Sequence, residues 1–88
     1  MTQRELTIVN KLGMHARPAG IFVREAAKFK CSIVVIKDGL EINGKSIMGL
    51  LMLAAECGSR LVIKADGPDE KDAVDALGRL FQDKFGED

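Results

Sequence analysis

The sequence predicts an α+β fold in which helices cover one face of a four-stranded antiparallel sheet. The first observation is the order of apolar patterns, which is strand, helix, strand, strand, helix, strand, helix, without the regular alternation of a parallel sheet. The second is an Asp38-Gly39 pair between two β-favouring segments, which is typical of a tight hairpin. The third is the length of 88 residues, which leaves room for one modest core. We therefore expect a single domain over residues 1–88.

Four segments of β-favouring residues are expected to form the strands. Residues 5–9 are the first, because their side chains alternate in character. Residues 32–37 and 40–43 flank the Asp38-Gly39 turn, and they form the best-defined local feature of the chain. Residues 60–65 supply the fourth strand.

Three segments have the character of helices. The first is expected over residues 16–28, where apolar residues recur at three- and four-residue steps. The second is expected from residue 47 to about residue 55. The third is expected to start at residues 69–72, a segment whose acidic groups suit a helix start, and Phe85 lies near its frayed end.

The second helical segment is apolar around almost its whole circumference, whereas a short surface helix needs only one apolar stripe. Either this helix is wholly buried, or one of its sides is kept for a partner protein. In a domain of this size the second alternative is favoured, and we expect a partly exposed patch formed by Ile47, Met48 and Leu51. Methionine suits a surface that adapts to several partners.

The composition argues against several classes of function. Hydrophobic residues make up 47% of the chain and charged residues 30%, which is ordinary for a globular protein. No apolar run approaches the roughly 20 residues that span a bilayer, and the N-terminal residues do not resemble a signal peptide. We therefore expect a cytoplasmic protein without a membrane partner. The absence of Trp and Tyr and of a dense basic run argues against nucleic acid.

The two cysteines, Cys31 and Cys57, match neither a metal-binding nor a CxxC spacing. Because the chain has a single histidine, there are too few soft ligands for a zinc site. We expect both cysteines to be reduced and mostly buried, and we expect neither a metal nor another cofactor.

The only histidine, His15, lies in the segment Gly13-Met14-His15-Ala16-Arg17-Pro18-Ala19. Pro18 suits the first turn of a helix, so His15 is expected at a helix N-terminus, close to the unpaired N–H groups of Ala16 and Arg17. Such an end binds anions, and a neutral imidazole beside a guanidinium is suited to carry a phosphoryl group. A histidine at a helix start is also often a capping or surface residue, and spacing alone favours that alternative.

Two motifs resemble those of a known family, and this resemblance favours the phosphoryl-carrier interpretation of His15 over the capping interpretation. Residues 13–19 resemble the active-site motif of the HPr family, the histidine-containing phosphocarriers of the bacterial phosphoenolpyruvate phosphotransferase system. The segment Gly44-Lys45-Ser46-Ile47-Met48-Gly49 resembles the regulatory serine segment of that family, at the usual distance from the histidine. The similarity extends over essentially the whole chain. It implies an open-faced β-sandwich of order βαββαβα with three helices on one face of the sheet.

The resemblance also implies a phosphoryl carrier rather than an enzyme. His15, with Arg17, would accept a phosphoryl group at Nδ1 from phospho-enzyme I, ultimately from phosphoenolpyruvate, and pass it to enzyme IIA-type acceptors. The backbone amides of Ala16 and Arg17, together with the Arg17 side chain, would stabilise the added charge. A carrier that alternates between partners needs its face exposed, so we expect a monomer.

Regulation and docking are expected at a second group of residues. Ser46 suits a helix N-cap, and the resemblance adds phosphorylation of its hydroxyl by an HPr kinase/phosphorylase. Partner proteins are expected to dock on Arg24, Ile47, Met48 and Leu51. The charge distribution agrees with acidic partners, because residues 1–45 carry a net charge of +4 and residues 46–88 a net charge of −4.

Two alternatives remain. A ferredoxin-like binding module for metal or RNA belongs to a different functional class, and the missing CxxC motif and aromatic residues argue against it. Within the family, a carrier of a nitrogen-related or regulatory phosphorelay would keep His15, Arg17 and Ser46 alike. The identity of the downstream acceptor separates that alternative from a carrier for sugar uptake.

Overall fold

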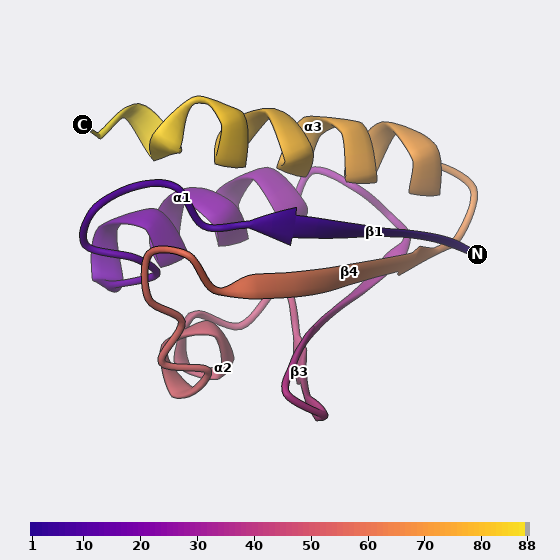
Figure 1. The fold of residues 1–88 in the computed structure, drawn as a ribbon. Coiled ribbons are helices and arrows are strands. Elements are labelled where there is room, and N and C mark those ends of the chain that lie inside the picture. The colour runs from indigo at the N-terminus through magenta and orange to yellow at the C-terminus, as the bar shows by residue number, and fades with distance from the viewer. Residues whose placement is uncertain (88) are drawn as a thin grey trace.

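Residues 1–87 are described by a computed structural model, which has one sheet and a set of helices packed against it (Figure 1). The order of the elements along the chain is the predicted one, and the α+β class with four antiparallel strands is confirmed. The elements are β1 (Thr2–Thr7), α1 (Ala16–Ala26), β2 (Ser32–Lys37), β3 (Leu40–Asn43), α2 (Ile47–Met52), β4 (Arg60–Asp66), α3 (Glu70–Gln82) and the 3-10 helix η1 (Lys84–Gly86).

The strands are arranged in the order β1-β4-β2-β3, and each neighbouring pair is antiparallel. In the register of the sheet, Ile63 of β4 lies opposite Arg4 of β1 on one side and Val35 of β2 on the other. The hairpin between β2 and β3 turns at Asp38 and Gly39, whose φ angles are 51° and 82°. Positive φ at both positions is what the sequence of this turn predicted.

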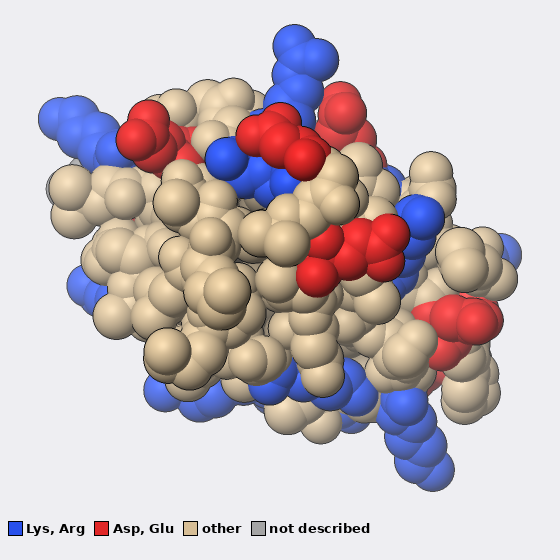
Figure 2. All heavy atoms as spheres, turned by 90° about the horizontal axis from the view of Figure 1, so that it is seen from below, with Lys and Arg blue, Asp and Glu red and all other residues tan. Residues whose placement is uncertain are grey.

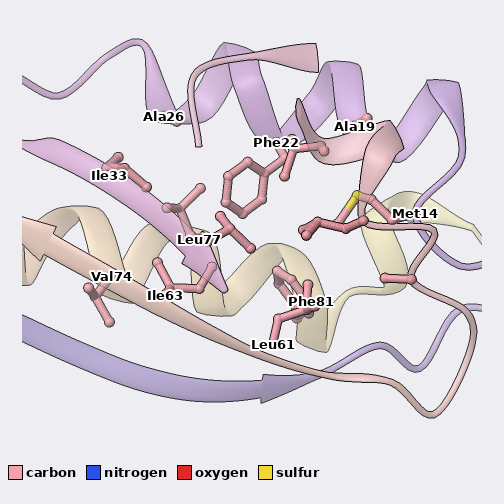
Figure 3. Packing of buried hydrophobic residues seen from close by; sticks show 14 of the residues in the cluster. Met14, Ala19, Phe22, Ala26, Ile33, Leu61, Ile63, Val74, Leu77 and Phe81 are labelled. Atoms are coloured by element: carbon pink, nitrogen blue, oxygen red, sulfur yellow. The ribbon is translucent and has the colours of Figure 1, made fainter. Parts of the chain in front are cut away.

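One face of the sheet is covered by α1 and α3, and the core lies between them and the strands. Alternate residues of β4, such as Leu61 and Ile63, are fully buried on this face. Figure 3 shows Phe22 of α1 and Leu77 of α3 extending into the same interior. Phe22 meets Phe81 edge to face, with ring centroids 6.2 Å apart. Truncation of such a buried phenylalanine costs about 3–5 kcal/mol, so these contacts hold α1 firmly on the sheet.

The short helix α2 packs against α1 and β3 (Figure 1). Leu50 faces the core with no exposed surface, whereas 44% of Ile47 and 70% of Met48 are exposed. Partial exposure of this apolar helix is therefore confirmed. Leu51 is half-buried and packs against the core, while Met52, which was not expected on this surface, is largely exposed.

The first strand does not lie where the sequence placed it. It spans Thr2–Thr7 instead of residues 5–9, because its ladder ends where Thr7 pairs with Arg60, the first residue of β4. Ile8 then turns into the core, where it is 1% exposed. The extent of the partner strand therefore sets the extent of β1.

Two helices end earlier than predicted. α1 stops at Ala26, where the chain tightens into a turn in which the Phe29 N–H donates to the Ala26 carbonyl. α2 stops at Met52, and Ala54 adopts a left-handed φ of 50°. A left-handed residue commonly ends a helix, although glycine is the usual choice.

Two expectations about buried residues require correction. Cys31 is buried, and burial raises the pKa of its thiol, but Cys57 is exposed because it lies in the turn before β4. Phe85 does not lie in a frayed end: it is buried and packs against Phe81 with ring centroids 5.0 Å apart. The segment after α3 is therefore held on the body of the protein.

None of the helices in residues 1–87 combines the length and the apolar character that a bilayer crossing requires. The same residues contain no cluster of three or more His, Cys, Asp and Glu side chains suited to a metal ion.

Candidate functional site

His15 is the N-cap of α1, as the position of Pro18 predicted. Its backbone is extended, with φ of −87° and ψ of −170°, and its carbonyl accepts a hydrogen bond of 3.0 Å from the Ala19 N–H. The imidazole itself makes no capping hydrogen bond, and 36% of the side chain is exposed. The ring nitrogens of His15 are therefore not used to cap the helix, and the ring is accessible for reaction.

The start of α1 offers hydrogen-bond donors next to this ring. The first N–H groups of a helix have no intrahelical partner, and Pro18 has no N–H at all, which leaves those of Ala16 and Arg17. Both residues are exposed, and the first turn of α1 contains no acidic side chain that would neutralise the positive end of the helix dipole. This end of α1 is thus suited to receive negative charge.

The loop before His15 rests on the turn that follows α2. The Met14 N–H donates a hydrogen bond of 2.8 Å to the Ala55 carbonyl. Gly13 has a φ of 70°, and a Cβ at this position would lie 2.5 Å from that same carbonyl oxygen and 2.9 Å from the Glu56 Cα. Only glycine satisfies both the backbone conformation and the close approach.

Two further residues reach His15 or its loop, and neither was predicted from the sequence. One oxygen of the Glu87 carboxylate lies 2.9 Å from the His15 Nε2. The other oxygen accepts a hydrogen bond of 3.0 Å from the side-chain amide of Asn10, which also donates to the Gly13 carbonyl at 2.8 Å. Glu87 is 72 residues from His15, so no local pattern could have indicated this contact.

A shallow cleft of about 550 Å³ opens beside the histidine. Lys11, Leu12 and Arg17 line it together with Gly86 and Glu87. The two basic side chains suit an anionic group, and Leu12, which is 74% exposed, adds an apolar rim.

Ser46 is the N-cap of α2, as predicted, and its Oγ accepts a hydrogen bond of 3.1 Å from the Gly49 N–H. The turn before it is held in place, because the Lys45 ammonium donates to the Phe29 carbonyl at 2.7 Å and the Lys45 N–H donates to Asn43. Ser46 therefore lies in a defined position next to the exposed side chains of α2.

An apolar surface surrounds this second position. Ile47, Met48 and Met52 are the exposed hydrophobic residues of α2, and Arg24 is exposed in the last turn of α1. Figure 2, which views the molecule from the side where α2 lies, shows a broad area without charge, with both basic and acidic side chains at its margin. Figure 1 shows α2 and the start of α1 at the same end of the molecule.

Comparisons with known proteins agree with this arrangement. A family model described as the PTS HPr component phosphorylation site matches residues 2–83. Phosphocarrier protein HPr of Treponema pallidum is 43% identical over the full length of both chains. The HPr-like protein Crh of Bacillus subtilis is 39% identical over 96% of this chain and 99% of its own.

Solved structures give the same result. HPr-C-His from Thermoanaerobacter tengcongensis has a TM-score of 0.97 at 44% identity, and the match covers 100% of this chain and 99% of the other. An HPr dimer from the same organism has a TM-score of 0.80 at 45% identity, covering 99% and 100% of the two chains.

The open-faced sandwich with a histidine at the start of α1, together with the family match, defines the class of protein: a small phosphocarrier component of a relay. The chain belongs to the HPr family of the phosphotransferase system. The family predicted from the two sequence motifs is therefore confirmed.

Proposed function

We propose that His15 accepts a phosphoryl group from phospho-enzyme I, ultimately from phosphoenolpyruvate, and passes it to an enzyme IIA-type acceptor. The observation that carries this proposal is the imidazole of His15, which stands at the start of α1, is 36% exposed and takes no part in capping. Residues 1–88 act as a single carrier domain in the cytoplasm, without a metal or other cofactor.

In the transfer step a neutral ring nitrogen of His15 attacks phosphorus, the new N–P bond forms, and the bond from phosphorus to the donor breaks. The group that arrives carries negative charge, which the amides of Ala16 and Arg17 stabilise together with the Arg17 guanidinium. Arg17 lines a solvent-exposed cleft and Ala16 is exposed, so an acceptor protein can reach the phosphoryl group.

The test is incubation with radiolabelled phosphoenolpyruvate and enzyme I, which should give an acid-labile label that His15→Ala abolishes. Arg17→Ala should slow transfer about ten- to a hundredfold, since a charge-assisted hydrogen bond is lost, and should leave the melting temperature unchanged because the side chain is exposed. Arg79→Ala, which removes an exposed arginine from α3, is the matched control. Persistence of the label in His15→Ala would reject the proposal.

Enzyme I and the acceptor proteins dock on the exposed surface beside the site. Ile47 and Met48 supply its apolar centre, Arg24 supplies positive charge, and the half-buried Leu51 contributes only its edge. Exposed apolar residues with basic residues nearby suit partners that present an apolar contact ringed by acidic groups.

Ser46 is the regulatory position, phosphorylated by an HPr kinase/phosphorylase. Its Oγ accepts a hydrogen bond from the Gly49 N–H, so the cap does not use the O–H group as a donor. Phosphorylation replaces the proton of that O–H group with a phosphoryl group. A phosphate there adds nearly two negative charges beside Met48, inside the docking surface. Its main effect is therefore on the binding of partners.

A carrier with a regulatory rather than a sugar-transport role is the second candidate, supported by the similarity to the HPr-like protein Crh. Transfer from phosphorylated protein to a panel of IIA-type acceptors separates the two.

The carrier acts as a monomer, which keeps its docking surface accessible. HPr from Thermoanaerobacter tengcongensis has been solved as a dimer. The molecular mass of this protein in solution is therefore the measurement that tests the monomeric state.

A further inference from the structure

The carboxylate of Glu87 lies between His15 and Asn10, and its two oxygens have different partners. Oε2 lies 2.9 Å from the His15 Nε2, and Oε1 accepts from the Asn10 side-chain amide at 3.0 Å. Only 12% of the Glu87 side chain is exposed, so these two contacts replace much of the water around it. A carboxylate in that position is stable only while it is hydrogen-bonded.

Asn10 shows that this arrangement is specific. It is fully buried, and both hydrogens of its amide are used, one on Glu87 and one on the Gly13 carbonyl. Its Oδ1 has no hydrogen-bond partner among residues 1–87, which costs about 1–3 kcal/mol in a buried group. An apolar residue would avoid that cost. The two hydrogen bonds that the Asn10 side chain donates, to Glu87 and to the Gly13 carbonyl, therefore explain why asparagine occupies this position.

The backbone before Glu87 is also strained. Lys84 and Phe85 both have left-handed φ angles, 55° and 54°, a conformation that costs about 1–2 kcal/mol for each residue other than glycine. Burial of Phe85 against Phe81 offsets this cost. The helix α3 runs to the end of the molecule where α1 begins, and this turn follows it there (Figure 1). Strain at such a position points to a functional constraint.

We propose that Glu87, oriented by Asn10, is a positioning residue for His15: it holds the imidazole proton on Nε2 and so leaves the lone pair on Nδ1. This inference rests on the proposed function of His15 as a phosphoryl acceptor. Both oxygens of the ionised Glu87 carboxylate can only accept hydrogen bonds, and one of them faces the His15 Nε2. The proton must therefore lie on Nε2 in the neutral ring.

The same contact acts during transfer. When Nδ1 attacks phosphorus, the N–P bond forms and the donor leaves, while the ring keeps its Nε2 proton and becomes cationic. The Glu87 carboxylate stabilises that cation through the Nε2–H, as the aspartate of a serine protease triad does for its histidine. When the phosphoryl group moves on, the N–P bond breaks and the ring returns to the neutral form with its proton still on Nε2.

The isosteric variant Glu87→Gln tests this directly. The glutamine carbonyl must face the Asn10 amide, so its NH2 group faces His15, where it can only donate. That contact places the lone pair on Nε2 and the proton on Nδ1, which blocks attack from Nδ1. We expect Glu87→Gln to slow single-turnover transfer by about ten- to a hundredfold, the loss associated with a hydrogen bond to a charged group.

The matched control is Asp83→Asn, which neutralises an exposed carboxylate of the same segment. The position of the proton is measured by nitrogen-15 NMR of the unphosphorylated protein at about pH 8.5, where imidazole side chains are ordinarily neutral. The expected result is a proton on Nε2 in the wild type and in Asp83→Asn, and on Nδ1 in Glu87→Gln, with similar melting temperatures for all three.

A proton that stays on Nε2 in Glu87→Gln, or a transfer rate within about threefold of the control, would overturn the inference. Because the NMR measurement needs no phosphoryl transfer, it also decides whether Glu87 orients the ring if labelling of His15 fails.

Discussion

Gly13→Ala measures how strongly the loop of His15 depends on the turn after α2. The φ of 70° costs a residue with a Cβ about 1–2 kcal/mol. The new Cβ would meet the Ala55 carbonyl oxygen at 2.5 Å and the Glu56 Cα at 2.9 Å, and both are backbone atoms that cannot rotate away. The loop must therefore move, which breaks the Met14–Ala55 hydrogen bond at a further cost of about 1 kcal/mol.

Together these effects should lower the free energy of unfolding by about 2–3 kcal/mol, a large part of the stability of a small domain. Urea unfolding followed by far-ultraviolet circular dichroism measures the loss. Gly39→Ala is the matched control, because its φ is 82° and a Cβ there would meet nothing within 4 Å. If Gly13→Ala loses no more stability than Gly39→Ala, close packing of this loop on residues 55–56 is refuted.

Two further predictions concern docking and acid stability. Ser46→Asp and Met48→Ala should raise the apparent KM for enzyme I and leave kcat and the melting temperature nearly unchanged, because Met48 is 70% exposed; an unchanged KM with a collapsed melting temperature would contradict this. The Thr2 hydroxyl, with the N-terminal ammonium and the Gly67 N–H, lowers the pKa of Glu70 from 4.5 to about 2. A lowered folded-state pKa stabilises the protein above the unfolded value, and this contribution is lost as the pH falls from about 4.5 to 2. Glu70→Gln should therefore flatten the dependence of stability on pH across that window in acid unfolding curves, and an unaltered slope would count against the assignment.

Features that depend on neighbours along the chain are predictable from residue types alone. The hairpin at Asp38-Gly39 follows from two residues that accept positive φ. The placement of His15 follows from Pro18, and the cap of α2 follows from the Ser46 hydroxyl, which reaches the N–H three residues later. Each interaction lies within one turn of chain, so the local residue types are sufficient to indicate it.

The errors share a different physical origin. The extent of β1 depends on where β4 begins, and β1 and β4 are joined only by pairing across the sheet. Cys57 is exposed because of the course of its turn, although its residue type is usually buried. Phe85 is buried because Lys84 and Phe85 adopt left-handed conformations after α3, and the ring of Phe85 packs on Phe81. None of these outcomes is encoded in a periodic pattern.

By itself the sequence determined the fold class, the order of its elements and the histidine that stands at the start of α1. Only the tertiary structure placed Glu87 against His15 and brought the Glu87 carboxylate within hydrogen-bond distance of Asn10, 77 residues away in the sequence. It also placed Gly13 in close contact with the turn after α2. The physical reason is that a cap or a tight turn is a local interaction, governed by neighbouring residues. A hydrogen bond between distant segments exists only after the core has brought those segments together.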